Sequence, residues 1–363
     1  MTPSIRINEA PEAAVIDVLT TLLSEGRVAA VITLQKGSDG ISYSLISDTA
    51  ELEKAVPMYP LMPSNLGQIL GRLTIAEAFR ETVAVVARPC ELRGFIELVK
   101  RQQGRLDNML IISHICGGVY PLECEVKGDI EALLPEYWKS FELGNAHPRL
   151  RPACRSCVEF VPYTADIAVN STGGGDSTAM MLNTPWSQEM LEGLYPEGTD
   201  EELDVNMISS IRESREGEKA KIFAEHARPG GLGGLVEVFG RCIGCHACSK
   251  ACPICYCTLC NFESSVSELS PEDYEREIEK RGGMRVPPDT VYFHLGRMSH
   301  IGISCVACGS CQDVCPVDIP ISILFKKVSE SVQDMFDYVP GRDPGEKLPV
   351  CTFEVDEFRE VED

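Results

Sequence analysis

Helical and strand-like patterns of apolar residues alternate along the first third of the chain. Apolar residues recur at helical spacing over 11–25 and stop at Gly26, and the apolar run at 28–34 predicts a buried strand. The alternation continues with predicted helices at 65–79 and 91–103 and predicted strands at 82–88 and 108–113. Helices that alternate with short apolar strands are typical of a layered α/β domain.

The pattern changes after about Leu150. Residues 166–182 contain two strand-like runs around a glycine turn, which predicts an α+β extension of the same domain. The polar stretch 199–226 predicts a helix, and the glycine-rich run that follows Pro229 predicts a linker. Two more helices are expected at 287–302 and 319–336.

These patterns divide the chain into three parts. We expect a first domain at 1–228, a second domain with a helical insertion at 229–335, and a C-terminal tail at 336–363. The 363 residues, 44% of them hydrophobic, suffice for two modest domains with cores of their own.

Composition bears on the cellular compartment of the protein and on the class of its binding partner. A formal net charge of -22 speaks against nucleic acid as a partner, because phosphates would be repelled. No apolar stretch reaches the ~18 residues of a membrane span, and the start of the chain lacks the features of a signal peptide. With 17 cysteines at metal-ligand spacings, the expected location is a reducing, oxygen-poor cytoplasm.

Eight cysteines form two copies of one motif, C-x2-C-x2-C-x3-C-P, which is the bacterial two-cluster ferredoxin signature. In such a module three thiolates of one run and the fourth of the other hold each 4Fe-4S cluster. One cluster is therefore expected on Cys242, Cys245, Cys248 and Cys315. The other is expected on Cys305, Cys308, Cys311 and Cys252. Zinc is the alternative, but zinc ribbons normally use separated C-x2-C pairs, so the repeated three-cysteine run favours iron.

Further cysteines lie at places where ligands gather. Cys90 and Cys116 each follow a predicted strand, and Cys154-x2-Cys157 forms a knuckle. Taken alone, Cys90 or Cys116 reads as a small buried hydrophobe, whereas the knuckle favours a metal. An added run provides three thiolates for a further 4Fe-4S site that Cys124 or Cys351 would complete, with a zinc knuckle as the alternative: Cys255, Cys257 and Cys260.

Three segments, RPCELRGFIELVK, DNMLIISHICGG and CRSCVEFVPYTADIAVNSTGGGDS, resemble in order the core of the coenzyme F-420 hydrogenase/dehydrogenase beta-subunit family, roughly over 85–185. Members of that family are iron-sulfur flavoproteins that bind FAD. The resemblance implies a third 4Fe-4S cluster on Cys90, Cys116, Cys154 and Cys157. It gives the fold class as an α/β (α+β) flavin-binding domain, followed by the 2x(4Fe-4S) ferredoxin-like domain.

The resemblance also implies which residues bind the flavin. The glycine-rich turn corresponds to Asn170, Ser171, Thr172, Gly173, Gly174, Gly175, Asp176 and Ser177. Consecutive glycines let backbone amides approach a pyrophosphate, although a plain hairpin would also use them. Ser64 and Asn65 resemble the family's phosphate-side segment and could equally be an N-cap, and Arg88 and Arg93 could meet phosphate or form ion pairs.

We therefore expect an iron-sulfur flavoprotein electron-transfer subunit of an oxidoreductase, with no catalytic residue of its own. It would pass electrons between an FAD-linked two-electron carrier, a deazaflavin or similar, and its clusters. Electrons would pass from the third cluster through the Cys255 site to the ferredoxin pair. The partner would be a formate dehydrogenase, hydrogenase or heterodisulfide-reductase-like catalytic subunit. The alternatives are a flavin-free iron-sulfur wire and a zinc-stabilised scaffold.

Overall fold

The N-terminal half is built on one mixed sheet of seven strands. The computed structural model describes residues 3–172, 176–196, 203–226, 231–264, 270–282 and 290–351. The strands are β1 (Ser4–Ile7), β2 (Ala30–Gly37), β3 (Gly40–Ile46), β4 (Val83–Ala87), β5 (Met109–His114), β6 (Ile167–Val169) and β7 (Thr178–Leu182). Their order is β1-β7-β6-β5-β4-β2-β3, with β2, β4, β5 and β6 parallel and the outer strands antiparallel to their neighbours.

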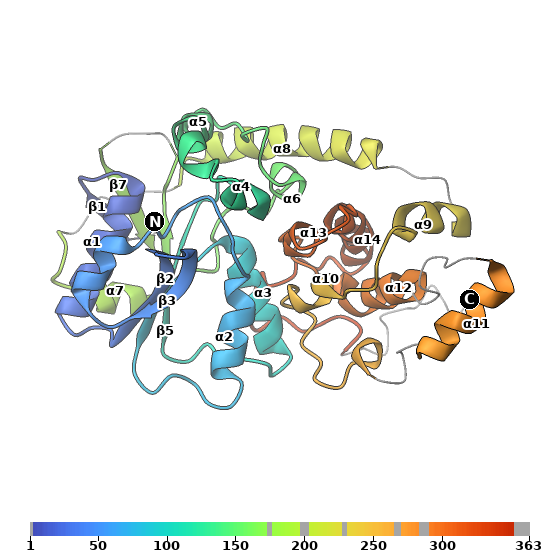
Figure 1. The fold of residues 1–363 in the computed structure, drawn as a ribbon. Coiled ribbons are helices and arrows are strands. Elements are labelled where there is room, and N and C mark those ends of the chain that lie inside the picture. Colours follow the sequence, from blue (N-terminus) through green and yellow to red (C-terminus); the bar gives the residue numbers. More distant parts are fainter. Residues whose placement is uncertain are drawn as a thin grey trace, which may run out of the picture.

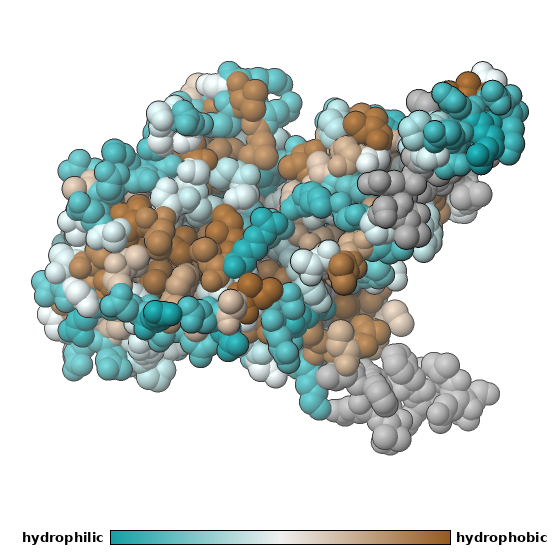
Figure 2. Space-filling view, turned by 60° about the horizontal axis from the view of Figure 1, so that its bottom comes forward, coloured by the Kyte–Doolittle hydropathy of each residue, from teal (hydrophilic) through white to brown (hydrophobic). Residues whose placement is uncertain are grey.

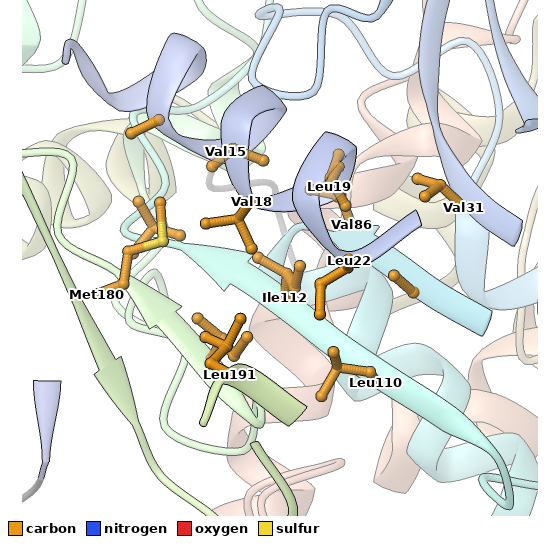
Figure 3. Packing of buried hydrophobic residues seen from close by; sticks show 14 of the residues in the cluster. Val15, Val18, Leu19, Leu22, Val31, Val86, Leu110, Ile112, Met180 and Leu191 are labelled. Carbon is orange, nitrogen blue, oxygen red and sulfur yellow. The ribbon is translucent and has the colours of Figure 1, made fainter. Parts of the chain in front are cut away.

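Helices cover both faces of this sheet, which explains why central strand β4 is apolar at every position. On one face, α1 (Pro11–Ser24) and α7 (Pro185–Leu191) pack against the strands. Figure 3 shows Val18 and Leu22 of α1 directed at Leu110 and Ile112 of β5. On the other face lie α2 (Leu66–Thr74) and α3 (Pro89–Lys100). The predicted α/β layering is therefore present.

Helix α2 ends earlier than the apolar pattern predicts, at Thr74 instead of 79. The Thr74 hydroxyl donates to the Leu70 carbonyl and accepts from the Arg105 amide, 3.1 Å away. This residue therefore ties the end of α2 to the loop after α3, and the chain turns there.

Short helices and one long helix complete the N-terminal half. Those around the sheet are η1 (Thr49–Lys54), α4 (Leu122–Val126), α5 (Ile130–Glu142) and α6 (Pro152–Arg155). Helix α8 (Val205–Glu225) begins at Asp204, whose side chain accepts from the amides of Asn206 and Met207. It extends from the sheet half toward the C-terminal half (Figure 1).

In its described residues the C-terminal half is helical. Its helices are α9 (Gly231–Phe239), α10 (Ala247–Lys250), η2 (Asn261–Glu263), α11 (Pro271–Arg281), α12 (Thr290–Ile301), η4 (Gly302–Ser304), α13 (Ser310–Asp313) and α14 (Ile321–Met335). Phe239, Phe293 and Phe325 form its core together with several cysteines. Part of the predicted glycine-rich linker belongs to α9, and 227–230, where the expected domain boundary falls, lie outside the described residues.

Helix α3 makes one of the contacts between the halves. A Cβ at Gly94 would lie 3.4 Å from Pro253 of the first ferredoxin motif. Glu97 accepts from the Tyr338 hydroxyl at 2.5 Å and from the Gly341 amide at 2.9 Å. The described part of the predicted tail therefore packs on α3, and residues 352–363 lie outside the described part.

Within the residues the structure describes, no helix is long and apolar enough to cross a membrane. The face shown in Figure 2 carries hydrophobic residues on both halves among mostly hydrophilic ones. The large exposed side chains include Ile243 and Leu259, which stand close in sequence to the cysteines of the C-terminal half.

Candidate metal centres and cofactor site

Four cysteines of the N-terminal half meet at the carboxyl edge of the sheet. Cys90 follows β4 at the start of α3, Cys116 follows β5, and Cys154 and Cys157 flank the end of α6. Burial raises the pKa of Cys154 to about 12; Arg151 opposes this, and the thiols of Cys116 and Cys157 add to it. The structure thus brings the four residues together. Because cluster binding requires thiolates, it must release these protons.

Two buried cations lie against this group. Arg215 of α8 donates to the carbonyls of Cys116 at 2.9 Å and Cys157 at 3.4 Å, and it lies over the Phe160 ring. Lys326 of α14 donates to the carbonyl and hydroxyl of Ser156. Burial lowers the pKa of Lys326, and the charge of Cys157 opposes that shift. These cations would offset the negative charge of thiolates.

Sequence reasoning missed Arg215, although a signal was present. It lies on the same face of α8 as the buried Ile208, Ile211 and Ile222, at i+7, i+4 and i-7 relative to them. A charged residue at a core position of a helical pattern is unusual unless it is paired. Its two carbonyl partners follow from the tertiary structure alone.

The second ferredoxin motif forms an enclosed site. One cavity is lined by Cys252, Cys305, Cys308 and Cys311. This is the ligand set predicted for one cluster, with its fourth cysteine supplied by the first motif. Pro253 lines the same cavity and packs on α3.

The first motif has the same backbone turn. Gly244 and His246 have positive φ, as do Ala307 and Gly309 at the equivalent positions of the second motif. Such turns aim consecutive amides at an anionic ligand. The Gly244 amide donates to Cys242 Sγ at 3.5 Å. The expected ligands Cys242, Cys248 and Cys315 belong to one packed cluster, and Cys245 is exposed.

Arg297 of α12 lies between the two ferredoxin sites. Its guanidinium donates to Cys248 Sγ at 3.0 Å and to the Cys248 carbonyl at 3.1 Å, and its side chain is buried. Burial disfavours its charge, but Cys248, Cys255, Cys252 and Cys311 outweigh this and raise its pKa. A fixed positive charge therefore faces thiols of both predicted clusters. The predicted insertion thus contributes a side chain to the centre of the module.

The N-terminal site adjoins the second ferredoxin site directly. Burial raises the pKa of Cys90 well above its ordinary value, and Cys308 is the ionisable neighbour that adds most to this. The Arg151 guanidinium donates to the Cys308 carbonyl at 3.3 Å and pairs with Asp313. A Cβ at Gly309 would lie 2.9 Å from the Ala153 Cβ, so the two turns touch. This contact differs from the expected route through the Cys255 site.

The remaining cysteines separate into two places. Cys255, Cys257 and Cys260 line one cavity of about 80 Å³ together with Arg297 and His300. Cys252 and Cys255 share a hydrogen bond, which lowers the pKa of Cys255 to about 6 and raises that of Cys252.

Cys124 lies elsewhere, in an apolar cluster of the N-terminal half with Leu34 and Tyr59. Arg149 donates to its sulfur at 3.8 Å. Cys351 is exposed and follows the part of the tail that packs on α3. Burial raises the pKa of the Tyr256 hydroxyl, Arg101 opposes the shift, and the thiols of Cys257 and Cys351 add to it.

The geometry of the cysteines differs from that of a single-ion site. Among the described residues, no three or more His, Cys, Asp or Glu side chains converge closely enough to hold one metal ion. A zinc site needs its thiolates ~2.3 Å from one centre. A 4Fe-4S cube binds each thiolate at a different iron, so its ligands stand farther apart.

The predicted flavin loop begins at the same sheet edge as Cys116. The Ser171 hydroxyl donates to the Ile115 carbonyl at 2.6 Å, and Asn170 Oδ1 accepts from the Thr172 amide and hydroxyl. Asp176 and Ser177 are exposed, and Arg6 donates to the Ser177 hydroxyl. Gly173, Gly174 and Gly175 lie outside the described residues.

The other predicted flavin residues divide into those that fit and those that do not. Asn65 is 1% exposed and neither polar atom of its side chain has a partner, which leaves a buried amide available to a ligand. Ser64 beside it is exposed. Arg88 bonds Glu91 and the carbonyls of Tyr59 and Leu61, so its guanidinium is occupied by the protein.

Arg93 is also engaged, since its Nε donates to the Pro340 carbonyl at 2.8 Å. Of the residues predicted for the flavin, Asn65 has unpartnered polar atoms, whereas the guanidinium of Arg88 and the Nε of Arg93 are bonded within the protein.

Comparison with known proteins agrees with an iron-sulfur domain in the C-terminal half. Residues 238–319 match the 4Fe-4S dicluster domain family. The chain is 27% identical over 358 residues to the F420-dependent formate dehydrogenase subunit beta of Methanocaldococcus jannaschii, covering 89% of each chain. It is 28% identical over 367 residues to the F420-dependent formate dehydrogenase 1 subunit beta of Methanococcus maripaludis, covering 89% of this chain and 88% of that one.

A weaker similarity links the chain to a solved structure, a xenon derivative of the F420-reducing [NiFe] hydrogenase complex from Methanosarcina barkeri. The TM-score is 0.45 with 13% identity, over 62% of this chain and 92% of that chain. Similarity at that level does not establish a shared fold. The two formate dehydrogenase subunits confirm the resemblance predicted from residues 85–185.

Proposed function

We propose that this chain, an oxidoreductase subunit homologous over most of its length to beta subunits of formate dehydrogenases, is an iron-sulfur flavoprotein electron-transfer subunit. It passes electrons between an FAD-linked two-electron carrier and 4Fe-4S clusters that lead to a partner catalytic subunit. The names of the relatives make a deazaflavin of the F420 type the preferred carrier and a formate dehydrogenase the preferred partner.

The observation that carries this proposal is the junction between Cys90 and Cys308, where Arg151 donates to the Cys308 carbonyl at 3.3 Å and the turn at Gly309 touches Ala153. These cysteines belong to different predicted clusters and to different halves of the chain. Cys308 shares its cavity with Cys252, and Cys252 bonds Cys255 beside Arg297. Thiol groups thus follow one another from the sheet edge to the exposed Cys245. A continuous series of this kind suits electron transfer and has no use in a scaffold.

The residues that would hold the flavin stand at the start of this series. Bound FAD exchanges two electrons as hydride and releases them singly, whereas each 4Fe-4S cluster takes one. Asn65 offers an unpartnered amide, and the turn at Asn170–Thr172 begins beside Cys116. Arg88 and Arg93 position α3 and the tail instead of binding a phosphate. The chain itself supplies binding and orientation.

The proposed division into domains follows the same logic. Residues 1–228 would bind the flavin and one cluster, residues 229–335 would form the dicluster module, and the tail from 336 would secure the module on α3. The partner would approach the C-terminal half, where Cys245 and Ile243 are exposed.

Anaerobic purification of the full chain tests the proposal. We expect a brown protein that releases FAD on denaturation and carries about twelve or more irons, four for each cluster. Asn65→Ala should lose most of the flavin and keep its iron, while Ser64→Ala should keep both. Iron without flavin in the wild-type protein would favour the flavin-free wire instead. Zinc without iron would overturn both.

A further inference from the structure

We propose that Cys255, Cys257, Cys260 and Cys351 hold an additional 4Fe-4S cluster beside the ferredoxin pair, and that Cys124 is not one of its ligands. The inference rests on the proposed function in one respect, because it takes the thiol groups of this chain to carry iron-sulfur clusters.

Three of the ligands already share an enclosure. Cys255, Cys257 and Cys260 line one cavity, and the rings of Phe262 and Phe293 form part of its wall. Phe262 is held against α12, since a Cβ at Gly296 would lie 2.3 Å from its ring. An apolar wall of this kind limits the access of water to a cluster.

Positive charge faces the same cavity. Arg297 lines it and is buried. A 4Fe-4S centre with four thiolates is an anion, so cations in its wall stabilise it. Lys250 also lines the cavity and pairs with Glu263 at 2.8 Å. The enclosure therefore has the charge as well as the thiols that a cluster needs.

The path of the tail supplies the fourth ligand. Tyr338 and Gly341 are bonded to Glu97 of α3, and Glu346 pairs with Lys100 at 3.5 Å. Arg101, the next residue after Lys100, hydrogen-bonds the Tyr256 hydroxyl, so the loop that contains the other three cysteines lies at the same end of α3 as Glu346. Cys351 follows Glu346 by five residues and is exposed, so the tail brings it to that loop.

Cys124 has no such route. It is packed among Leu34, Ile41 and Tyr59 in the sheet half, and its sulfur accepts from Arg149. Reaching Cys255 would require it to leave that core. The seventeenth cysteine of the chain is therefore assigned as a buried apolar residue, the ordinary role of an unligated cysteine.

The additional cluster would lie to one side of the route from the N-terminal site to the ferredoxin pair. Cys255 is hydrogen-bonded to Cys252 of one ferredoxin site. It also belongs to the same packed cluster as Cys248 of the other site. Cys257 is exposed, and Leu259 beside it is 99% exposed. The site therefore connects the ferredoxin pair to a second position on the surface, from which electrons could reach another protein.

Iron and acid-labile sulfide per chain test the proposal in four full-length proteins prepared anaerobically: wild type, Cys257→Ala, Cys351→Ala and Cys124→Ala. The Cys257 and Cys351 variants should each lose about four irons, and the Cys124 variant should lose none. Electron paramagnetic resonance of the reduced proteins should lose one signal in the first two variants and keep the others. Unchanged signals from the other clusters show that the variants fold.

Four results would overturn the proposal. They are full iron in Cys257→Ala, full iron in Cys351→Ala, loss of iron in Cys124→Ala, and one zinc per chain in the wild type bound at this site. Flavin content and the remaining cluster signals, measured on the same samples, report separately on the proposed function. A wild type that carries all cluster signals but no flavin would count against that function and not against the ligand assignment.

Discussion

The guanidinium of Arg151 and the carboxylate of Asp313 lie 2.5 Å apart in a buried ion pair that joins the two halves of the chain. Arg151 stands just before the Cys154 knuckle, and Asp313 follows Cys311 on α13. Arg151 also donates to the Met62 carbonyl at 3.1 Å and to the Cys308 carbonyl. This pair therefore fixes the distance between the N-terminal site and the second ferredoxin site.

Removing the charge of Asp313 should destabilise the protein strongly. Asp313→Asn leaves Arg151 buried without a counter-charge, which costs about 3 kcal/mol or more. The midpoint of urea unfolding, measured anaerobically, should fall accordingly. The matched control is Asp129→Asn, because Asp129 pairs with Arg149 on the surface and should contribute less than about 1 kcal/mol. Equal effects of the two variants would contradict the role given to Asp313.

Loss of the Arg215 guanidinium should affect the N-terminal cluster alone. Arg215→Met leaves the carbonyls of Cys116 and Cys157 without their donor, so the protein should lose about four of its irons while its ferredoxin signals stay. Arg212→Met serves as control, since Arg212 is one turn away on α8 and bonds only the Val158 carbonyl and Glu159. Full retention of iron in Arg215→Met would show that the guanidinium is dispensable.

The charge of Arg297 should raise the reduction potential of the clusters that it faces. Arg297→Gln removes a buried positive charge 3.0 Å from Cys248 Sγ, and this disfavours the extra electron. The potential of at least one ferredoxin cluster should fall by about 60 mV or more, equivalent to a tenfold change in the equilibrium. Arg297→Lys keeps the charge and should shift the reduction potential by less than half as much as Arg297→Gln does. Similar shifts in both variants would mean that the charge is not the cause.

His294 should make the fold sensitive to mild acid. Burial and the nearby Arg297 lower its pKa to about 4, and neither ring nitrogen has a partner. Its folded pKa lies below the unfolded value of about 6.5, so the unfolded chain binds the proton first and stability falls as pH drops through that window. Between about pH 7.5 and 5.5 the free energy of unfolding of the wild type should fall by about 1.4 kcal/mol more than that of His294→Phe.

Urea unfolding across that pH range measures this difference. His226→Gln is the control, since His226 ends α8 and its Nδ1 donates to the Ile222 carbonyl. It should keep the pH dependence of the wild type. A His294→Phe protein that loses the same stability as the wild type would contradict the assignment.

The sequence predicted those parts of the site that covalent spacing determines. Cys305, Cys308 and Cys311 lie within seven residues, so their shared cavity follows from the motif, and the crossing of Cys252 into it follows from the repeat. Strand ends could be read from apolar runs, which placed Cys90 and Cys116 at one edge of the sheet.

What the sequence did not predict depends on contacts between distant segments. Arg151 meets Asp313, and the tail that carries Cys351 packs on α3 through the bonds of Tyr338 and Gly341 to Glu97. Composition predicts a linker at the glycine-rich run. Part of that run is instead helical in α9, where Leu235 packs against the C-terminal core. Tertiary packing there overrides the low helix propensity of glycine.

We propose that electrons enter at the N-terminal site and reach the ferredoxin pair across the junction that brings Cys90 near Cys308, where Arg151 bonds the Cys308 carbonyl and Ala153 touches Gly309. Rapid mixing of the anaerobic full-length protein with a reduced deazaflavin, followed by freezing and electron paramagnetic resonance, tests it most directly. The wild type should show reduced ferredoxin-type clusters, whereas Cys90→Ala should keep those clusters but leave them oxidised. Reduction of the ferredoxin pair at the same rate in both proteins would contradict the account.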